Sequence, residues 1–119
     1  MEKRSDLFDE LIGEQLSSVT FVQDYLQLDF DGNKLTLFVW PTVHSKGLKW
    51  KFPQQEYRNE LCSIIAKKVE KTLFNEGRQL SFLFDDGCEI LVPLNKHNPE
   101  MYGPEILTYK NSKDEWIFA

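Results

Sequence analysis

The chain has 119 residues, of which 41% are hydrophobic and 28% charged, and a formal net charge of −5 from 14 basic and 19 acidic side chains. No apolar stretch reaches the roughly 20 residues of a membrane span, residues 1–6 lack the apolar run of a secretory signal, and the acidic balance argues against nucleic-acid binding. We therefore expect a single cytoplasmic domain over residues 1–119, with no membrane and no nucleic acid as partner.

The first third of the chain predicts one short helix and three strands. Ser5 and Asp6 can cap a helix, which Gly13 ends. The apolar stripe of this helix consists of Leu7, Phe8, Leu11 and Ile12. From Leu16 onward the apolar period changes to two, as in a strand. The strands that this pattern predicts lie near 16–22, 24–30 and 33–40.

The middle of the chain predicts the same elements again. Pro53 suits the first position of a helix, because the N–H that proline lacks has no partner there. The apolar face of this second helix consists of Tyr57, Leu61, Ile64 and Ile65, with the stem of Lys68 at its edge. The strands that follow lie near 69–75, 78–84 and 88–93. The segment 93–104 holds three prolines and is expected to be a loop.

Two Asp-Gly hairpin turns at equivalent places indicate an internal repeat. The repeated units cover about 5–41 and 54–93, and each reads helix, strand, strand, strand. A C-terminal hairpin over 105–118, with strands at Glu105–Tyr109 and Glu115–Phe118, completes the chain. We therefore predict the α+β class, with an antiparallel sheet on which two helices pack.

Turn length fixes how each hairpin pairs. A two-residue Asp31-Gly32 loop sets Phe30, Leu28 and Leu26 opposite Asn33, Leu35 and Leu37. In the second copy, a three-residue Asp85-Asp86-Gly87 loop ending in a left-handed glycine sets Phe84, Phe82 and Leu80 opposite Cys88, Ile90 and Val92. Cys88 is then expected to be a core residue.

Paired carboxylates are the first candidates for chemistry. Aspartates beside glycine at a hairpin tip, such as Asp31, Asp85 and Asp86, are typical turn formers. Asp29 is expected to form an ion pair with Lys34 on the facing strand. We therefore expect no metal site and no acid–base catalysis at these residues.

Histidines and cysteines are the remaining chemical candidates. His44 and His97 follow the two hairpins in parallel positions, and they could form a small ligand-binding or enzymatic site if their loops meet. Neither has the neighbours of a known catalytic motif. Cys62 and Cys88 lack metal-binding and redox spacing and are expected to be buried free thiols. We expect no catalytic residue and no cofactor.

Aromatic rings and lysines gather after the first hairpin. The rings belong to Tyr25, Phe38, Trp40, Trp50, Phe52 and Tyr57, and the lysines are Lys46, Lys49 and Lys51. Two interpretations stay open: exposed rings would form a binding surface, or a helix or the C-terminal hairpin covers them. The loop that contains Glu100 and Tyr102 is a second candidate, because long loops in compact domains are often functional.

The order of these elements resembles a group of small bacterial proteins. Leu11-Ile12-Gly13 precedes a Val19-x-Phe21 strand, a hairpin closes on Phe30-Asp31-Gly32, and a second copy ends in a Pro-Glu loop and a closing Trp strand. This pattern, over about residues 11–118, resembles families that occur beside toxin genes and are interpreted as immunity proteins of polymorphic or contact-dependent toxin systems. The resemblance implies an acidic, cytoplasmic, single-domain protein that acts by binding, and it supplies no catalytic residue.

These observations favour a non-enzymatic protein-binding module that neutralises a toxin domain by occlusion. Acidic side chains would steer a basic partner and aromatic side chains would anchor it. The candidates for steering are Asp24, Asp85, Asp86, Glu89 and Glu100, and those for anchoring are Trp40, Trp50 and Tyr102. The alternatives are the site with His44 and His97, or a self-associating structural module. Whether the chain is a monomer or a dimer stays open.

Overall fold

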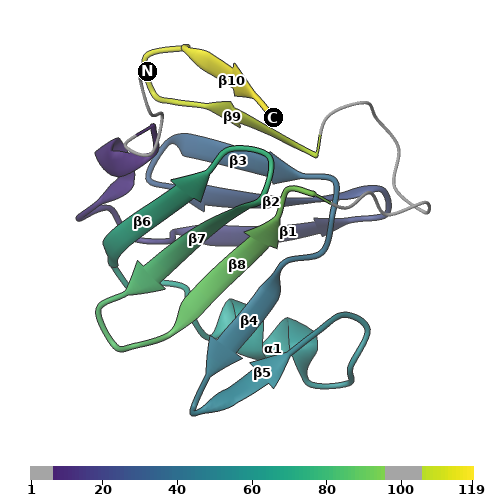
Figure 1. Ribbon diagram of the computed structural model, residues 1–119. Helices are drawn as coiled ribbons and strands as arrows, with labels where there is room; N and C mark the ends of the chain where they lie inside the picture. Colours follow the sequence, from purple (N-terminus) through teal and green to yellow (C-terminus); the bar gives the residue numbers. More distant parts are fainter. Residues whose placement is uncertain (1–6, 96–105) are drawn as a thin grey trace.

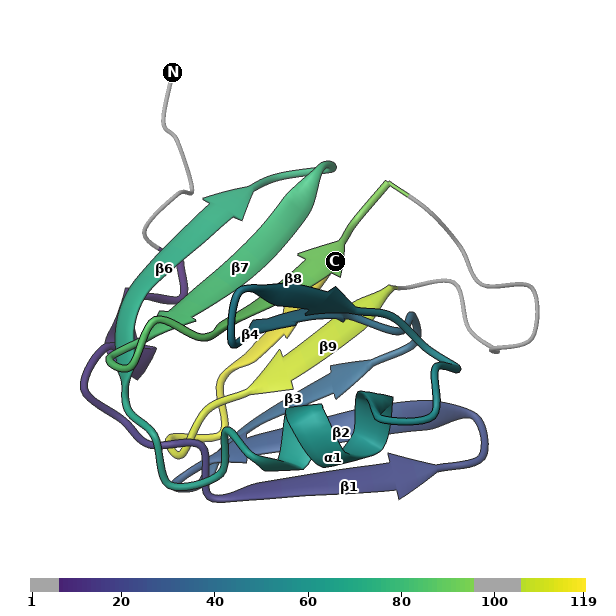
Figure 2. The ribbon, with the colours of Figure 1, turned by 90° about the horizontal axis from the view of Figure 1, so that it is seen from below.

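The computed structural model describes residues 7–95 and 106–119, which form two five-stranded antiparallel sheets packed face to face (Figures 1 and 2). Sheet 1 has the strand order β1 (Ser18–Val22), β2 (Tyr25–Phe30), β3 (Asn33–Leu37), β9 (Leu107–Lys110) and β10 (Trp116–Phe118). Sheet 2 has the order β5 (Leu48–Trp50), β4 (Thr42–Ser45), β8 (Glu89–Pro93), β7 (Gln79–Phe84) and β6 (Val69–Asn75).

The predicted α+β class is wrong, because the protein is 49% strand and 9% helical, with two sheets instead of one. The first predicted helix is only the 3-10 turn η1 (Asp9–Leu11). Phe8 and Leu11 are buried as predicted, but Ile12 is exposed and Gly13 turns the chain at φ +92°. In a segment this short, the few hydrogen bonds of a helix do not offset the conformational entropy lost in helix nucleation, so only one turn forms.

The second predicted helix exists but is shorter than its apolar pattern suggests. It is α1 (Tyr57–Cys62), and Tyr57, Leu61 and the following Ile64 are fully buried, whereas Ile65 of the predicted face is exposed. The helix ends early because the N–H groups of Ala66 and Val69 donate to the carbonyls of Leu16 and Glu14 in the N-terminal segment instead of to the preceding turn. α1 contacts β1 and β4 and so closes one side of the sandwich (Figure 2).

The hairpin of β4 and β5 was not predicted. Its turn is Lys46-Gly47, in which both residues have positive φ (+56° and +75°) as in a two-residue hairpin loop. Lysine is an uncommon first residue of such a turn, and the strands are short, so the local signal is weak. β4 forms because Val43 packs into the core opposite Ile90 of β8.

The predicted pairing of both Asp-Gly hairpins is confirmed. Phe30 pairs with Asn33 and Leu28 with Leu35 in the first, and Phe82 pairs with Ile90 in the second. The longer second turn ends in Gly87 at φ +92°, and the Phe84 N–H donates to the Cys88 carbonyl at 2.8 Å. Cys88 is buried as expected, whereas Cys62 is exposed, and both thiols are free.

The hairpins that follow the two repeated units join opposite sheets. The β1-β2-β3 meander lies in sheet 1, but the β4–β5 hairpin that follows it joins sheet 2 beside β8. The β6-β7-β8 meander lies in sheet 2, and the β9–β10 hairpin that follows it joins sheet 1 beside β3. Each sheet therefore contains the meander of one unit and the hairpin that follows the other unit.

Reciprocal hydrogen bonds join the starts of the two units. The Gly13 N–H donates to the Val69 carbonyl at 2.8 Å, and the Ala66 N–H donates to the Leu16 carbonyl at 2.7 Å. Between them, Gln15 and Lys68 form an isolated antiparallel bridge. Because Gly13 aligns with Ala66 and Leu16 with Val69, these bonds are related by an approximate twofold axis through the bridge.

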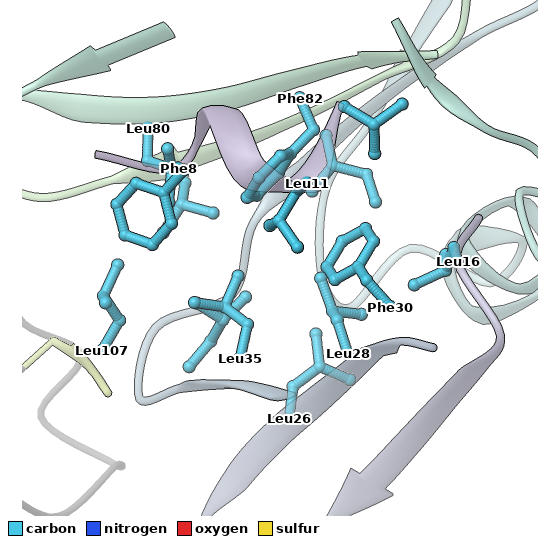
Figure 3. Packing of buried hydrophobic residues seen from close by; sticks show 14 of the residues in the cluster. Phe8, Leu11, Leu16, Leu26, Leu28, Phe30, Leu35, Leu80, Phe82 and Leu107 are labelled. Atoms are coloured by element: carbon cyan, nitrogen blue, oxygen red, sulfur yellow. The ribbon is translucent and has the colours of Figure 1, made fainter. Parts of the chain in front are cut away.

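One cluster of buried side chains fills the space between the sheets (Figure 3). Phe30 of sheet 1 meets Phe82 of sheet 2 with ring centroids 5.3 Å apart. Phe8, just before η1, contacts Phe74 and Phe82 of sheet 2 and Tyr109 of sheet 1 in edge-to-face geometry. The segment before β1 therefore covers the core and joins the two sheets.

Candidate functional site

The aromatic residues predicted as a binding surface pack against one another and against α1. Trp40 stacks on Phe52 at a centroid distance of 3.9 Å and lies beside Phe21 at 6.3 Å. The Tyr57 ring meets both Trp40 and Phe52 edge-on, and its hydroxyl donates to the Pro41 carbonyl. The geometry thus agrees with the interpretation in which a helix covers these rings, and Trp40 is only half-exposed.

The other predicted anchors do not join Trp40. Trp50 pairs with Val43 and packs half-buried against the core, with its indole N–H buried and without a hydrogen-bond partner among the described residues. Tyr102 and Glu100 lie outside the described residues. The predicted anchoring surface is therefore not assembled by the part of the chain that the structure describes.

The predicted steering carboxylates fall into two groups. Asp24 and Asp85 are exposed. Asp86 forms an ion pair with Lys67 at 2.6 Å, and Glu89 lies 3.3 Å from His44. Asp29 faces Lys34 in the sheet, but its carboxylate accepts from the Gly32 N–H at 2.7 Å and no ion pair joins the two residues. Only Asp24 and Asp85 therefore have carboxylates without a hydrogen bond or ion pair among these described residues.

Asp86 is the centre of a small polar cluster at the β7–β8 turn. Burial alone would raise the pKa of Asp86, but hydrogen bonds from Lys67 Nζ and from the Cys88 N–H outweigh it and leave that pKa below its usual value. The Cys88 Sγ lies 3.4 Å from Asp86 Oδ2 and 3.7 Å from Ser45 Oγ, and its single S–H can donate to either oxygen. Burial raises the pKa of Cys88, so the thiol stays protonated and the cluster reads as structural.

The predicted histidine site is not formed by the described residues. His44 lies on the outer face of sheet 2 beside Glu89, and His97 lies outside residues 7–95 and 106–119. Within those two ranges, no group of three histidine, cysteine or acidic side chains could hold a metal ion. None of the described helices is long and apolar enough to cross a bilayer.

Three leucines form an apolar patch on the outer face of sheet 2. Leu73 of β6 and Leu91 of β8 both face Ser81 of β7, and Leu83 is the next outward residue of β7. We call Leu73, Leu83 and Leu91 the leucine patch. Ser81 is only 6% exposed although it points outward, which shows that the leucines close over it. An outward face of an antiparallel sheet is normally polar, so this cluster is unusual.

The leucine patch is hollowed and bordered by charge. One hollow of about 320 Å³ is lined by Leu73, Ser81 and Leu83 together with Lys71 and Glu89. A second hollow of about 440 Å³ includes Leu91 and Pro93, and its other lining residues, Asn75, Arg78, Gln79 and Asn95, are polar or charged. No described element packs on this face, as both ribbon views show (Figures 1 and 2). An apolar centre with a charged rim is the composition of a protein-binding surface.

A second exposed apolar group lies on β10 of sheet 1. Trp116 is 55% and Phe118 60% exposed, and their rings stack with centroids 5.8 Å apart. Lys110 of β9 lies over the Trp116 ring at 5.5 Å. These aromatics and the leucine patch lie on the outer faces of opposite sheets.

Neither group was found from the sequence, although the signal was present. The register that buries Phe82 and Ile90 also turns Leu83 and Leu91 outward, since side chains alternate along a strand. Trp116 and Phe118 are two residues apart and share a face for the same reason.

Comparison of the chain with protein-family models, curated proteins and solved structures found no match.

Proposed function

We propose that this chain is a non-enzymatic protein-binding module of the immunity-protein type, which neutralises a toxin domain by covering it. The leucine patch is the observation that carries the proposal. It is apolar, open in the described residues, and bordered by Lys71, Glu89 and Arg78. Apolar patches on an otherwise polar sheet face mark protein interfaces.

The chemistry of the partner follows from the patch and from the net charge. Three leucines favour a complementary apolar surface, because burying them releases their hydration water. The net charge of −5 favours a basic partner through long-range attraction. Asp24 and Asp85, which are exposed, remain the candidates for steering. The proposal includes a cytoplasmic location and requires no cofactor.

The binding test uses the tagged full-length chain in its native host. We expect chemical crosslinking to capture one protein in near-equimolar amount. Leu73→Lys should weaken that complex at least about tenfold, because it sets a charge at the centre of an apolar interface. Thr20→Lys is the matched control, since Thr20 is also exposed on a strand but lies on the other sheet. The absence of an equimolar partner, or equal loss in both variants, would contradict the proposal.

The inhibition test uses a toxin domain encoded beside this chain. We expect co-expression to restore growth, Leu73→Lys to lose this protection and Thr20→Lys to keep it. His44→Ala should also keep it, since the imidazole contacts Glu89 at the rim of the leucine patch, where single contacts contribute little to binding. Loss of protection in His44→Ala alone would favour the ligand-binding or enzymatic alternative instead.

A further inference from the structure

The edge of β10, which pairs with no further strand of the described residues, differs from the other three edges of the two sheets. β5 carries Lys49 at its centre, and β6 carries Glu70 and Lys71 at a register shift. β1 presents Ser18 and Thr20 outward. Charges, bulges and polar residues are among the devices that keep sheet edges from pairing, and a short strand is another. β10 consists of Trp116, Ile117 and Phe118 and is as short as β5, but it carries no charge, bulge or polar side chain.

The hydrogen bonds between β9 and β10 show which backbone groups of β10 are free. Ala119 and Leu107 exchange N–H···O bonds at 3.0 Å, and the Asn111 N–H donates to the Glu115 carbonyl at 3.0 Å. In an antiparallel pair such exchanges occur at every second residue. The backbone groups of Trp116 and Phe118 therefore point away from β9, and no strand of residues 7–95 or 106–119 pairs with them.

We propose that β10 pairs with β10 of a second copy of the chain, antiparallel, with the twofold axis at Ile117. In this register Trp116 of one copy faces Phe118 of the other, and each outward N–H and C=O of these residues has a partner. The two exposed aromatics also meet across the new strand pair, where such pairs stabilise a sheet. Sheet 1 of one copy and sheet 1 of the other then form one continuous sheet across the dimer.

The register is selected by the backbone of the neighbouring turn. A twofold axis at Trp116 would set Phe118 opposite Asp114 of the other copy. Asp114 has φ +65° and cannot continue the strand, so Phe118 would lose its backbone partners. The Ile117-centred register is therefore the one that uses both outward residues. A second copy fits this edge because the same two residues satisfy each other.

The oligomeric state tests the interface. Sedimentation velocity of the full chain over a range of concentrations should reach twice the mass of one chain. Trp116→Lys should remain monomeric. Leu48→Lys is the matched control and should still dimerise, because Leu48 is 57% exposed but lies on the β5 edge. A chain that stays monomeric at every concentration, or a dimer that survives Trp116→Lys, would overturn the proposal.

Disulfide trapping tests the register. The two native cysteines are first removed by Cys62→Ser and Cys88→Ala, and circular dichroism checks that this background variant is folded. Ile117→Cys should crosslink, because facing Cα atoms in a non-hydrogen-bonded pair lie about 4.5 Å apart, within disulfide range. Trp116→Cys should not, because two copies of residue 116 would be about 8 Å apart from the strand spacing. Equal crosslinking of both variants would overturn the register. Protection of the β10 amides from hydrogen exchange only after a different protein is added would overturn the dimer, because a strand of that protein would then be the occupant of the edge.

The dimer and the proposed function are separable. The leucine patch lies on sheet 2 and β10 at the edge of sheet 1. Leu73→Lys should leave the sedimentation of the chain unchanged, and Trp116→Lys should leave capture of the partner unchanged.

Discussion

At the residue scale, Gly13 and Ala66 occupy equivalent turns but differ in strain. Both have left-handed backbone, with φ +92° and +80°, and both N–H groups donate to the opposite unit. An L-residue in this conformation costs about 1–2 kcal/mol, whereas glycine adopts it freely. Ala66 therefore carries backbone strain that its counterpart Gly13 avoids. The hydrogen bond from the Ala66 N–H to the Leu16 carbonyl holds Ala66 in this strained conformation.

Exchanging the residue types at these two positions should have opposite effects. Ala66→Gly should raise the free energy of unfolding by about 0.5–1 kcal/mol, because relief of strain exceeds the added entropy of the unfolded chain. Gly13→Ala should lower it by about 0.5–1 kcal/mol through the same balance, and since a Cβ at Gly13 meets no atom within 4 Å, no steric clash adds to that loss. Urea denaturation measures both, and destabilisation by Ala66→Gly would show that Ala66 is unstrained.

At the scale of elements, η1 matters through the contacts that flank it. The Thr72 hydroxyl donates to Asp9 on the side of sheet 2. The Tyr109 hydroxyl donates to Glu10 Oε2 at 2.6 Å on the side of sheet 1. With Phe8 packed between them, this single turn closes the sandwich opposite α1, which explains why the segment is ordered without being a full helix.

Removing the Phe8 ring should therefore lower the free energy of unfolding far more than removing another side chain of the same turn. Phe8→Ala should lower the free energy of unfolding by about 3–5 kcal/mol, because the side chain is fully buried against three aromatic rings. Ile12→Ala is the control and should cost less than about 1 kcal/mol, since Ile12 is 46% exposed. Similar losses for the two variants in urea denaturation would mean that Phe8 does not close the core in solution.

At the scale of the whole molecule, placement of the hairpins in opposite sheets couples the two units. Each sheet is completed by the hairpin that follows the other unit, and the buried side chains of both sheets form one cluster. We therefore expect the two sides of the sandwich to unfold together. Tyr57 reports on the side closed by α1, and Tyr109 on the side closed by η1.

Alkaline titration tests this coupling. Burial raises the pKa of Tyr57, and burial together with the hydrogen bond to Glu10 raises the pKa of Tyr109. Because the folded protein favours the neutral phenols, their contribution to stability is fully present below the unfolded pKa of about 10 and is lost as the pH rises through the folded pKa values. Tyrosinate absorbance from both residues should appear together with loss of the strand signal in circular dichroism. Tyr57→Phe and Tyr109→Phe identify each contribution, and ionisation of either residue before unfolding would contradict the coupling.

The sequence determined the local structure wherever the signal was local. The length of each turn follows from Asp31-Gly32 and Asp85-Asp86-Gly87, and turn length sets which residues face each other. The pairing of Phe30 with Asn33 and that of Phe82 with Ile90 were therefore predictable. The burial of Tyr57 and Leu61 followed from helical spacing in the same way. The length of α1 did not, because it is limited by hydrogen bonds to the distant Leu16.

Only the tertiary structure decided which strands share a sheet and which side chains stay exposed. Strands of both units have the same period, so nothing local assigns β4 to β8 or β9 to β3. Exposure depends on what packs over a residue: α1 covers Trp40, whereas no described element covers Leu73 or Trp116. The sequence by itself therefore determined hairpins and apolar faces, because their causes lie within a few residues. The sandwich and its open surfaces depend on contacts between residues far apart in the chain.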